Sequence, residues 1–345
     1  MMVTAAVLSS ALLVLGRLPP ASATLSFSAG FSSDAVLQRS TGSEGARVYG
    51  FTDSAAPVSV TVGGEDAAGK PVEYRVAASV APWTGGADVH PDTPPPPPHG
   101  NFTWAATLKP AAAGGALTIS ASNGETNGTA TIERITHGDV FFCSGQSNMA
   151  LETYYTFSAD TLKAEIAAGK FHNLRHFMNG NMGLHYEAAT PQWVTTQNSA
   201  GTAAPNADPF VWHNVSASAA LPSMDNATKR HSPFAQFAAT CMYFGAELIA
   251  ARESLGVDAT VPVGLIQSAI GGSQIESWMD NETLRLCANE SLTGGAIPND
   301  AGALYYGMVA PFVNYSVAGW IWCAHGFAGA AHSALFCVQP DSHSK

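Results

Sequence analysis

The sequence predicts an α/β fold, in which a parallel sheet is flanked by helices, preceded by a small all-β sandwich domain. Two observations indicate this arrangement. In the first part of the chain, apolar and polar residues alternate with a period of two, which is typical of half-buried strands. From about residue 135, continuous apolar runs bracket a helical pattern, and this order indicates parallel strands covered by helices.

Short alternating segments mark the strands of the first part. They are residues 58–62 (Val-Ser-Val-Thr-Val) and 117–120 (Leu-Thr-Ile-Ser), and the glycine pairs at 63–64 and 114–115 predict turns beside them. Residues 82–100 contain five consecutive prolines and are expected to form an exposed loop with polyproline character. We therefore expect residues 24–133 to form a β-sandwich.

The second part contains two buried strands with a helix between them. Residues 140–143 (Val-Phe-Phe-Cys) and 261–266 (Val-Pro-Val-Gly-Leu-Ile) are continuous apolar runs. A helix is expected to begin at its N-cap Ser232, with Pro233 as its first residue, and to end at Gly256. Its apolar positions recur at helical spacing and are Phe234, Phe237, Cys241, Gly245 and Leu248.

The composition excludes several classes of protein. The 345 residues include 15 Lys+Arg and 26 Asp+Glu, a net charge of −11, with 12% charged and 46% hydrophobic residues. This content suits a large buried core rather than a disordered chain. Because the chain is acidic and lacks clusters of Lys or Arg, neither nucleic acid nor an anionic membrane is an expected partner. The apolar stretch 307–322 is interrupted by Pro311, Asn314 and Ser316, so it predicts a buried strand or helix and no membrane span.

The N-terminus predicts export. Residues 5–15 form an apolar run too short to span a bilayer, and the small residues 21–23 (Ala-Ser-Ala) follow it as in a cleavage site. We therefore expect residues 1–23 to be a signal peptide, with a buried strand as the alternative, and the protein to be secreted or lysosomal. Seven sequons agree with export, at Asn101, Asn127, Asn214, Asn226, Asn281, Asn289 and Asn314.

The cysteines do not predict a metal site. They lie at positions 143, 241, 287, 323 and 337, without a Cys-x-x-Cys pair or a spacing typical of zinc ligands. The odd number leaves at least one thiol free or paired between chains, and the pairing of the others is open.

Two turns are the candidate functional segments, because ligands bind at the carboxyl ends of strands in open α/β sheets. The first turn presents Ser147 after the strand of residues 138–145. A serine on such a turn has backbone N–H groups nearby, so attack and oxyanion stabilisation can share one loop. The second turn, after residue 270, carries Glu276 for a substrate hydroxyl and Trp278 for stacking on a sugar. An orienting hydrogen bond and core packing are the alternatives for these two residues.

The two turns together resemble the sialate O-acetylesterase family of SGNH hydrolases. The resemblance rests on residues 145–149 (Gly-Gln-Ser-Asn-Met) and 271–278 (Gly-Gly-Ser-Gln-Ile-Glu-Ser-Trp). Further similar segments are residues 36–39, 237–245 and 304–315, so the resemblance covers roughly residues 26–322.

This family removes O-acetyl groups from sialic acids with no metal or other cofactor. The resemblance assigns Ser147 as the nucleophile, and its own N–H and that of Gly272 as oxyanion donors, with Gly271 as the alternative to Gly272. It implies an acetyl-enzyme that water hydrolyses to acetate, and a histidine that takes the serine proton. The candidate substrate-binding residues are Gln146, Asn148, Glu276 and Trp278.

The chain departs from the family after Trp322. The family continues with a Tyr-Gln-Gly-Glu-x-Asn block and later an Asp-x-x-His motif, neither of which is present in this sequence. We therefore expect residues 134–322 to be an incomplete SGNH-like esterase domain and residues 323–345 to be a divergent tail, from an alternative transcript, a retained intron or a gene-model error. The tail contains His325, His332 and His343, and structural roles are expected for His137, His176 and His231.

Two classes of function follow from these observations. The first is a carbohydrate O-acetylesterase, acting on sialic acid or on another acetylated sugar such as a plant or algal polysaccharide. The second is a catalytically impaired carbohydrate-binding or decoy product of a truncated esterase. In both, the expected partner is an acetylated sugar, and the oligomeric state is open.

Overall fold

The computed structural model describes residues 25–28, 30–83, 101–125, 128–179, 211–225, 230–287, 302 and 304–323. The predicted signal peptide, most of the proline-rich loop and the tail from residue 324 lie outside the described residues.

The strands are β1 (Leu25–Phe27), β2 (Val36–Gln38), β3 (Arg47–Thr52), β4 (Ser59–Glu65), β5 (Pro71–Ala77), β6 (Ser79–Pro82), β7 (Phe102–Thr107), β8 (Gly114–Ser122), β9 (Thr129–Gly145), β10 (Leu174–Met178), β11 (Trp212–Asn214), β12 (Met224–Asp225), β13 (Arg230–His231), β14 (Val263–Ala269) and β15 (Gly319–Cys323). The α-helices are α1 (Ala159–Ala167), α2 (Val215–Ala220), α3 (Pro233–Gln236), α4 (Ala239–Leu255) and α5 (Asn281–Cys287). Short 3-10 turns are η1 (Ser147–Met149), η2 (Thr153–Tyr155), η3 (Ile275–Trp278) and η5 (Ala310–Phe312), and η4 (Tyr305–Val309) is a π-helical turn.

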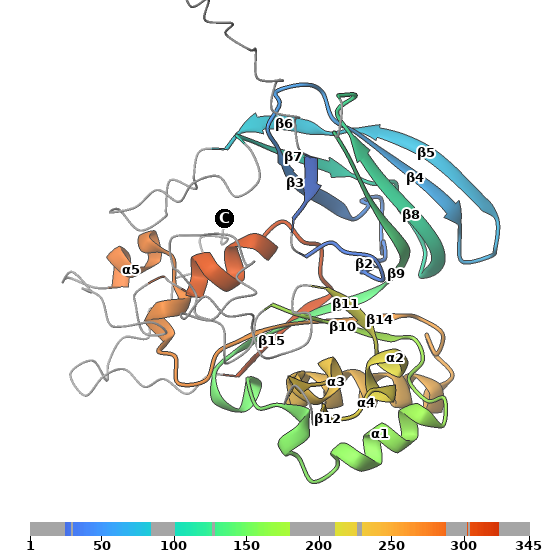
Figure 1. Ribbon diagram of the computed structural model, residues 1–345, viewed down its shortest axis with the longest axis vertical. Coiled ribbons are helices and arrows are strands. Elements are labelled where there is room, and N and C mark those ends of the chain that lie inside the picture. The colour runs from blue at the N-terminus through green and yellow to red at the C-terminus, as the bar shows by residue number, and fades with distance from the viewer. Residues whose placement is uncertain are drawn as a thin grey trace, which may run out of the picture.

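The N-terminal strands pair antiparallel, as expected of an all-β region. The strands β1, β3, β7 and β6 form a four-stranded sheet, while β4 pairs with both β5 and β8. Val48 and Trp104 from the first sheet are buried in one cluster with Val60 and Ile119 from the second. The two groups of strands, in the upper part of Figure 1, therefore share one apolar core.

The glycine pairs do not form the turns that the sequence predicts. The pair at 63–64 lies inside β4 and the pair at 114–115 begins β8. The turn after β4 is instead closed by Asp66, whose Oδ1 accepts two backbone N–H groups at 2.9 Å. Gly64 has a φ of +130°, and a Cβ there would collide with the carbonyl oxygen of Ala116. The glycine is needed for the close pairing of β4 with β8, not for a turn.

A single long strand, β9, runs through both parts of the molecule. Its first half pairs antiparallel with β8, and its second half is parallel to β14 on one side and to β15 on the other. The sheet that contains it is therefore mixed, with the order β11-β10-β14-β9-β8-β4-β5 and with β2 and β15 also paired to β9. The expected domain boundary at residues 133–134 falls inside this strand.

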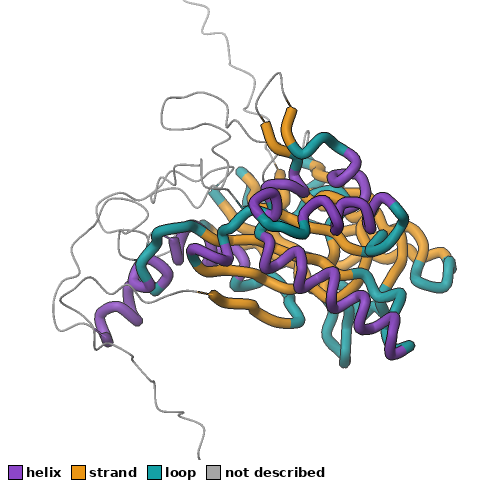
Figure 2. The backbone as a smooth tube through the Cα atoms, turned by 90° about the horizontal axis from the view of Figure 1, so that it is seen from below, coloured by secondary structure: helices purple, strands orange, loops and turns teal. Residues whose placement is uncertain are grey.

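The α/β arrangement of the second part is confirmed, in a mixed rather than a wholly parallel sheet. The strands β10, β14 and β9 are parallel, whereas β11 is antiparallel to β10. All seven residues of β14 are buried, as predicted for a central strand. Helices α1 to α4 lie on one side of these strands, which Figures 1 and 2 show from two directions.

The helix predicted between residues 232 and 256 is split in two. Its ends are as predicted: the Oγ of Ser232 accepts the N–H of residue 235, and Gly256, with a φ of +65°, ends α4. At the break, the Phe237 carbonyl accepts hydrogen bonds from the N–H and Oγ1 of Thr153. The N–H of Ala238 donates to Gln267 Oε1 at 2.7 Å. Because neighbouring segments take these backbone groups, the helical hydrogen bonds stop there.

Candidate active site

The strands β9, β14 and β15 end together at one edge of the sheet. Their last residues, Gly145, Ala269 and Cys323, are neighbours in the register of the sheet. Because the strands are parallel, the turns that follow β9 and β14 begin at the same edge of the sheet. The structure therefore brings together the turns of residues 146–149 and 270–278, which the sequence singles out.

The turn after β9 is attached to both neighbouring strands. The N–H of Gln146 donates to the Cys323 carbonyl at 2.9 Å, and the N–H of Ile270 donates to the Gly145 carbonyl at 3.0 Å. Gly145 has a φ of +132°, and a Cβ there would collide with the carbonyl of Cys323. Only glycine permits this approach, so the backbone just before the serine is held in one place.

Ser147 occupies this turn in a left-handed conformation. Its φ is +51°, and the residue is exposed. It begins η1, which is closed by hydrogen bonds from Met149 to Gln146 (3.0 Å) and from Ala150 to Ser147 (2.9 Å). Such a conformation costs a non-glycine residue roughly 1–3 kcal/mol and is concentrated at functional sites. A strained, exposed serine after a buried strand keeps Ser147 as the candidate nucleophile, in a turn that differs from the Gly-x-Ser-x-Gly elbow.

The turn after β14 offers open backbone at Gly272. This residue has a φ of +78° and is exposed, and apart from its two chain neighbours no described residue has an atom within 4 Å of the point that a Cβ would occupy. A ligand can therefore approach its backbone closely. The rest of the loop is braced from within, because Trp278 Nε1 donates to Ser273 Oγ at 2.9 Å and this hydroxyl donates to the Ile270 carbonyl at 2.8 Å.

The two tryptophans at this edge of the sheet, Trp278 and Trp322, differ in how exposed they are to solvent. Trp278 is only 6% exposed and packs with Ile270, Leu304 and Met308. The edge of its ring meets Trp322, with 5.4 Å between the ring centroids. Trp322 is 42% exposed, so it presents an indole at this edge of the sheet. Sequence reasoning missed Trp322 as a candidate, although the alternation Trp-Ile-Trp at 320–322 indicates an exposed strand face.

Glu276 carries a buried oxygen that lacks a partner. Its Oε2 makes no hydrogen bond among the described residues, while its backbone carbonyl accepts the N–H of Gly302 at 3.0 Å. Leaving a buried polar atom unpaired costs roughly 1–3 kcal/mol, which a ligand hydroxyl can recover. The binding role of Glu276 and an orienting bond within the loop both stay predictions.

The two residues that flank Ser147 differ in their surroundings. Gln146 is 6% exposed, whereas Asn148 is exposed and its carbonyl accepts the Oγ1 of Thr240 at 3.0 Å. The side chain of Asn148 is therefore accessible beside the candidate nucleophile, whereas that of Gln146 is buried. Their roles in substrate binding stay predictions.

Two of the earlier histidines are interior residues. His137 is buried, and desolvation lowers its pKa to about 4. His176 is buried on β10, its Nε2 hydrogen-bonds with the Oγ of Ser218 (2.9 Å), and burial together with the neighbouring His213 lowers its pKa well below the usual value. Both side chains are neutral at pH 7, in agreement with the structural roles expected for them.

His231 packs against the segment that follows the serine turn. Its Nδ1 lies 3.9 Å from Glu152 Oε2, and its ring meets that of Tyr154 edge to face at 4.6 Å. Burial raises the pKa of the Glu152 carboxyl. This contact joins β13 to η2 and gives His231 the packing role that the sequence indicates.

The stability of the protein is expected to fall in mild acid. Because burial lowers the folded-state pKa of His137 to about 4, the unfolded chain binds more protons than the folded chain between pH 6.5 and pH 4. The contribution of His137 to the free energy of unfolding is therefore fully present above pH 6.5 and is lost as the pH falls toward 4. The loss is at most on the order of 3 kcal/mol. Urea unfolding at pH 7 and pH 5 measures the loss.

The matched variants for this prediction are His137→Gln and His172→Gln. The first removes one buried imidazole and is expected to reduce the pH dependence, with the remainder due to the buried His176, whereas the second changes an exposed histidine and is expected to leave the pH dependence unchanged. An unchanged slope in His137→Gln would contradict the assignment.

A disulfide lies beside the serine turn. It joins Cys143 of β9 to Cys241 of α4, whose Cα atoms are 6.0 Å apart. Cys323 is a free thiol, while the side chains of Cys287 and Cys337 lie outside the described part of the chain. The structure thus settles for two cysteines the pairing that the sequence leaves open.

The described residues contain no candidate metal cluster and no candidate membrane-spanning helix. Within them, no three His, Cys, Asp or Glu side chains are grouped so as to hold a metal ion. No helix of this described part combines the length and the apolar character needed to cross a membrane.

Several known proteins are similar to this chain in sequence or in fold. Human sialate O-acetylesterase is 25% identical over 306 residues, which are 86% of this chain and 47% of that protein. The enzyme of the same name from Mus musculus is 27% identical over 187 residues, covering 54% of this chain and 29% of that protein. The crystal structure of a carbohydrate acetylesterase from Xanthomonas citri superposes with a TM-score of 0.53 and 21% identity, covering 88% of this chain and 51% of that one. No protein-family model matches the chain.

These matches show the fold of the chain and its relatives. The chain has the α/β fold of that carbohydrate acetylesterase, and it spans about half the length of the proteins it matches. It is a homologue of the sialate O-acetylesterases, which confirms the resemblance drawn from the turns at residues 145–149 and 271–278.

Proposed function

We propose that this chain is a carbohydrate O-acetylesterase that removes O-acetyl groups from sialic acids through Ser147. The observation that carries the proposal is the serine itself, exposed and at positive φ, at the sheet edge where the glycine turn of β14 also emerges. The homology to sialate O-acetylesterases supports the reaction class. In this proposal residues 134–322 are an SGNH-type esterase domain and residues 24–133 a β-sandwich domain, with β9 common to both.

The proposed reaction is acyl transfer. The Oγ of Ser147 attacks the acetyl carbonyl carbon, the ester C–O bond breaks, and the sugar leaves as an alcohol after taking a proton. Water then attacks the acetyl-enzyme and releases acetate with the free serine. Backbone N–H groups of Ser147 and Gly272 stabilise the negative oxygen of each tetrahedral intermediate, and each such donor is worth about 10²–10³-fold in rate. The family resemblance implies a histidine that accepts the serine proton, and because the family's Asp-x-x-His motif is absent from this sequence, the proposed bases are the tail histidines His325, His332 and His343.

Three side chains at the edge suit a sugar substrate. The unpaired Oε2 of Glu276 can accept a hydroxyl, Asn148 offers an amide beside the nucleophile, and the exposed indole of Trp322 can stack on a sugar face. Trp278, which is buried, supports this surface from below. We therefore propose Trp322 as the stacking residue and Trp278 as its support.

We further propose that the protein passes through the secretory pathway. The disulfide between Cys143 and Cys241 suits an oxidising compartment. The sequon residues Asn101 and Asn314 are exposed, and Asn214 caps α2 with its Oδ1. The sequons at Asn127, Asn226 and Asn289, and the side chain of Asn281, lie outside the described residues.

Acetate release from two substrates tests the proposal. The full chain is expected to release acetate from an O-acetylated N-acetylneuraminic acid, and to do so faster than from an acetylated neutral polysaccharide such as acetylxylan. Equal rates on both would contradict the sialic acid specificity. No release from either would contradict the esterase assignment and favour a carbohydrate-binding protein without activity.

A further inference from the structure

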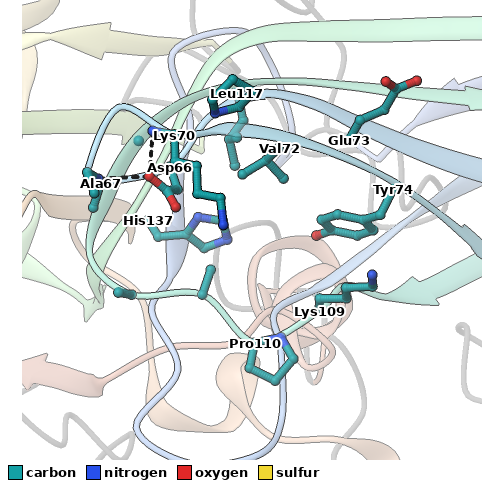
Figure 3. A pocket seen from close by; sticks show the side chains of 16 residues that line it. Asp66, Ala67, Lys70, Val72, Glu73, Tyr74, Lys109, Pro110, Leu117 and His137 are labelled. Atoms are coloured by element: carbon teal, nitrogen blue, oxygen red, sulfur yellow. Dashed lines mark hydrogen bonds between the residues drawn. The ribbon is translucent and has the colours of Figure 1, made fainter.

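A cavity lies in the N-terminal region, apart from the serine turn. It has a volume of about 510 Å³ and is bounded by β5, the start of β8 and residues 109–112, with His137 of β9 among its lining residues. Figure 3 shows the side chains around it. From His137 to the end of β9 at Gly145 the strand extends roughly 25 Å, because each residue rises about 3.3 Å. A single sugar cannot occupy this cavity and the serine turn together.

The walls of the cavity are suited to the apolar face of a sugar ring. Val72, Leu117 and Pro110 line it with hydrocarbon, and Tyr74 adds an aromatic ring whose hydroxyl points toward the middle in Figure 3. The ammonium of Lys109 covers this ring at 4.8 Å from its centroid, which fixes the ring in place.

Two polar groups of the cavity have no partner among the described residues. His137 is 2% exposed, and its buried Nε2 makes no hydrogen bond among the described residues. The Lys70 ammonium forms no ion pair with any described residue. Of the nearby carboxylates, Asp66 accepts two backbone N–H groups of its turn through Oδ1, and Glu73 points away from the centre in Figure 3.

We propose that this cavity is a second, non-catalytic binding site for a carboxylate-bearing sugar. The Lys70 ammonium pairs with the sugar carboxylate, and the Nε2 of His137 hydrogen-bonds with a hydroxyl. The hydrocarbon walls and Tyr74 contact the C–H face of the ring. Lys70 is exposed, and its ammonium can pair with a carboxylate, which a neutral sugar lacks. The inference rests on the proposed function only in taking a glycan as the partner.

Amide NMR chemical shifts can locate the binding directly. The probe is the methyl glycoside of N-acetylneuraminic acid, added to the isotope-labelled full chain carrying Ser147→Ala. The expected result is saturable shifts of amides in residues 66–74 and 109–117. Lys70→Met is expected to weaken this binding about 10-fold or more, since a charge-assisted hydrogen bond is lost, and Lys70→Arg is expected to retain it.

The matched control is Arg75→Met. Arg75 lies next to Tyr74 on β5, is exposed, and hydrogen-bonds with Thr61 Oγ1 on the neighbouring strand, so this variant removes one cation outside the cavity lining. Its affinity is expected to equal that of the parent.

Three results would overturn the inference: shifts confined to residues 145–149 and 270–278, an equal response to methyl galactoside, or unchanged affinity in Lys70→Met. Failure of the esterase assignment is a separate result, because loss of acetate release would leave the shifts in residues 66–74 in place.

Discussion

Replacing Ser147 by alanine is expected to lower kcat/KM for an O-acetylated sialic acid by about 10⁴-fold or more, because the acetyl-enzyme can no longer form. Acetate release from parent and variant, at equal concentrations of folded protein, measures the effect. In the parent, a rapid quench followed by peptide mass analysis is expected to find the acetyl group on the peptide that contains Ser147.

The control for this substitution is Ser254→Ala. Ser254 lies at the end of α4, where its Oγ donates to the carbonyl of Ala251 at 2.9 Å, so its loss is expected to leave turnover unchanged. Retention of more than a tenth of the parent activity in Ser147→Ala would remove this serine from the mechanism.

The strained backbone of Ser147 can be tested by measuring stability as well as turnover. Glycine adopts positive φ without a steric penalty, so Ser147→Gly is expected to abolish turnover while raising the free energy of unfolding by up to about 1 kcal/mol. A catalytic residue kept in a strained conformation is predicted to show this opposition between activity and stability. A serine retained only for packing would lose stability instead.

Removing the disulfide is expected to have the largest effect on stability. Cys143 and Cys241 are separated by 98 residues, and closing a loop of that length restricts the unfolded chain strongly. The double variant Cys143→Ala/Cys241→Ala is expected to lose about 2–5 kcal/mol of unfolding free energy. Because Cys143 lies two residues before Gly145, the serine turn is also expected to become more accessible to proteases.

Denaturant unfolding with and without reductant checks this prediction. The parent is expected to lose stability on reduction, while the double variant is insensitive to reductant. Cys323→Ala is the control, because Cys323 is a free thiol. Equal stability of the oxidised parent and the double variant would show that the bond contributes nothing.

Local patterns were sufficient to predict the types of the main elements. The continuous apolar runs before Ser147 and before Gly271 are buried parallel strands, as expected. The helix ends at Ser232 and Gly256 were also predictable, because capping depends on the few residues around each end. The two candidate functional turns were predictable for the same reason, because each consists of a strand end, a glycine and the residues that follow directly in the chain.

Long-range contacts decided the features that local patterns predicted wrongly or left open. The break at residues 237–238 depends on hydrogen bonds to Thr153 and Gln267, which are distant in the chain. Gly64 was expected in a turn, yet it lies within β4, where it makes room for the carbonyl of Ala116 on β8. Neither partner can be inferred from the residues next to the position that it affects.

The sequence by itself determined where the candidate nucleophile stands, because Ser147 and its glycine turn form one local motif at the end of a strand. Only the tertiary structure decided what surrounds it: the adjacency of Gly145 and Cys323, the pairing of Cys143 with Cys241, and the exposure of Trp322 rather than Trp278. The physical reason is that strand register and burial arise from contacts between segments far apart in the chain, whereas turns and caps are formed by neighbours.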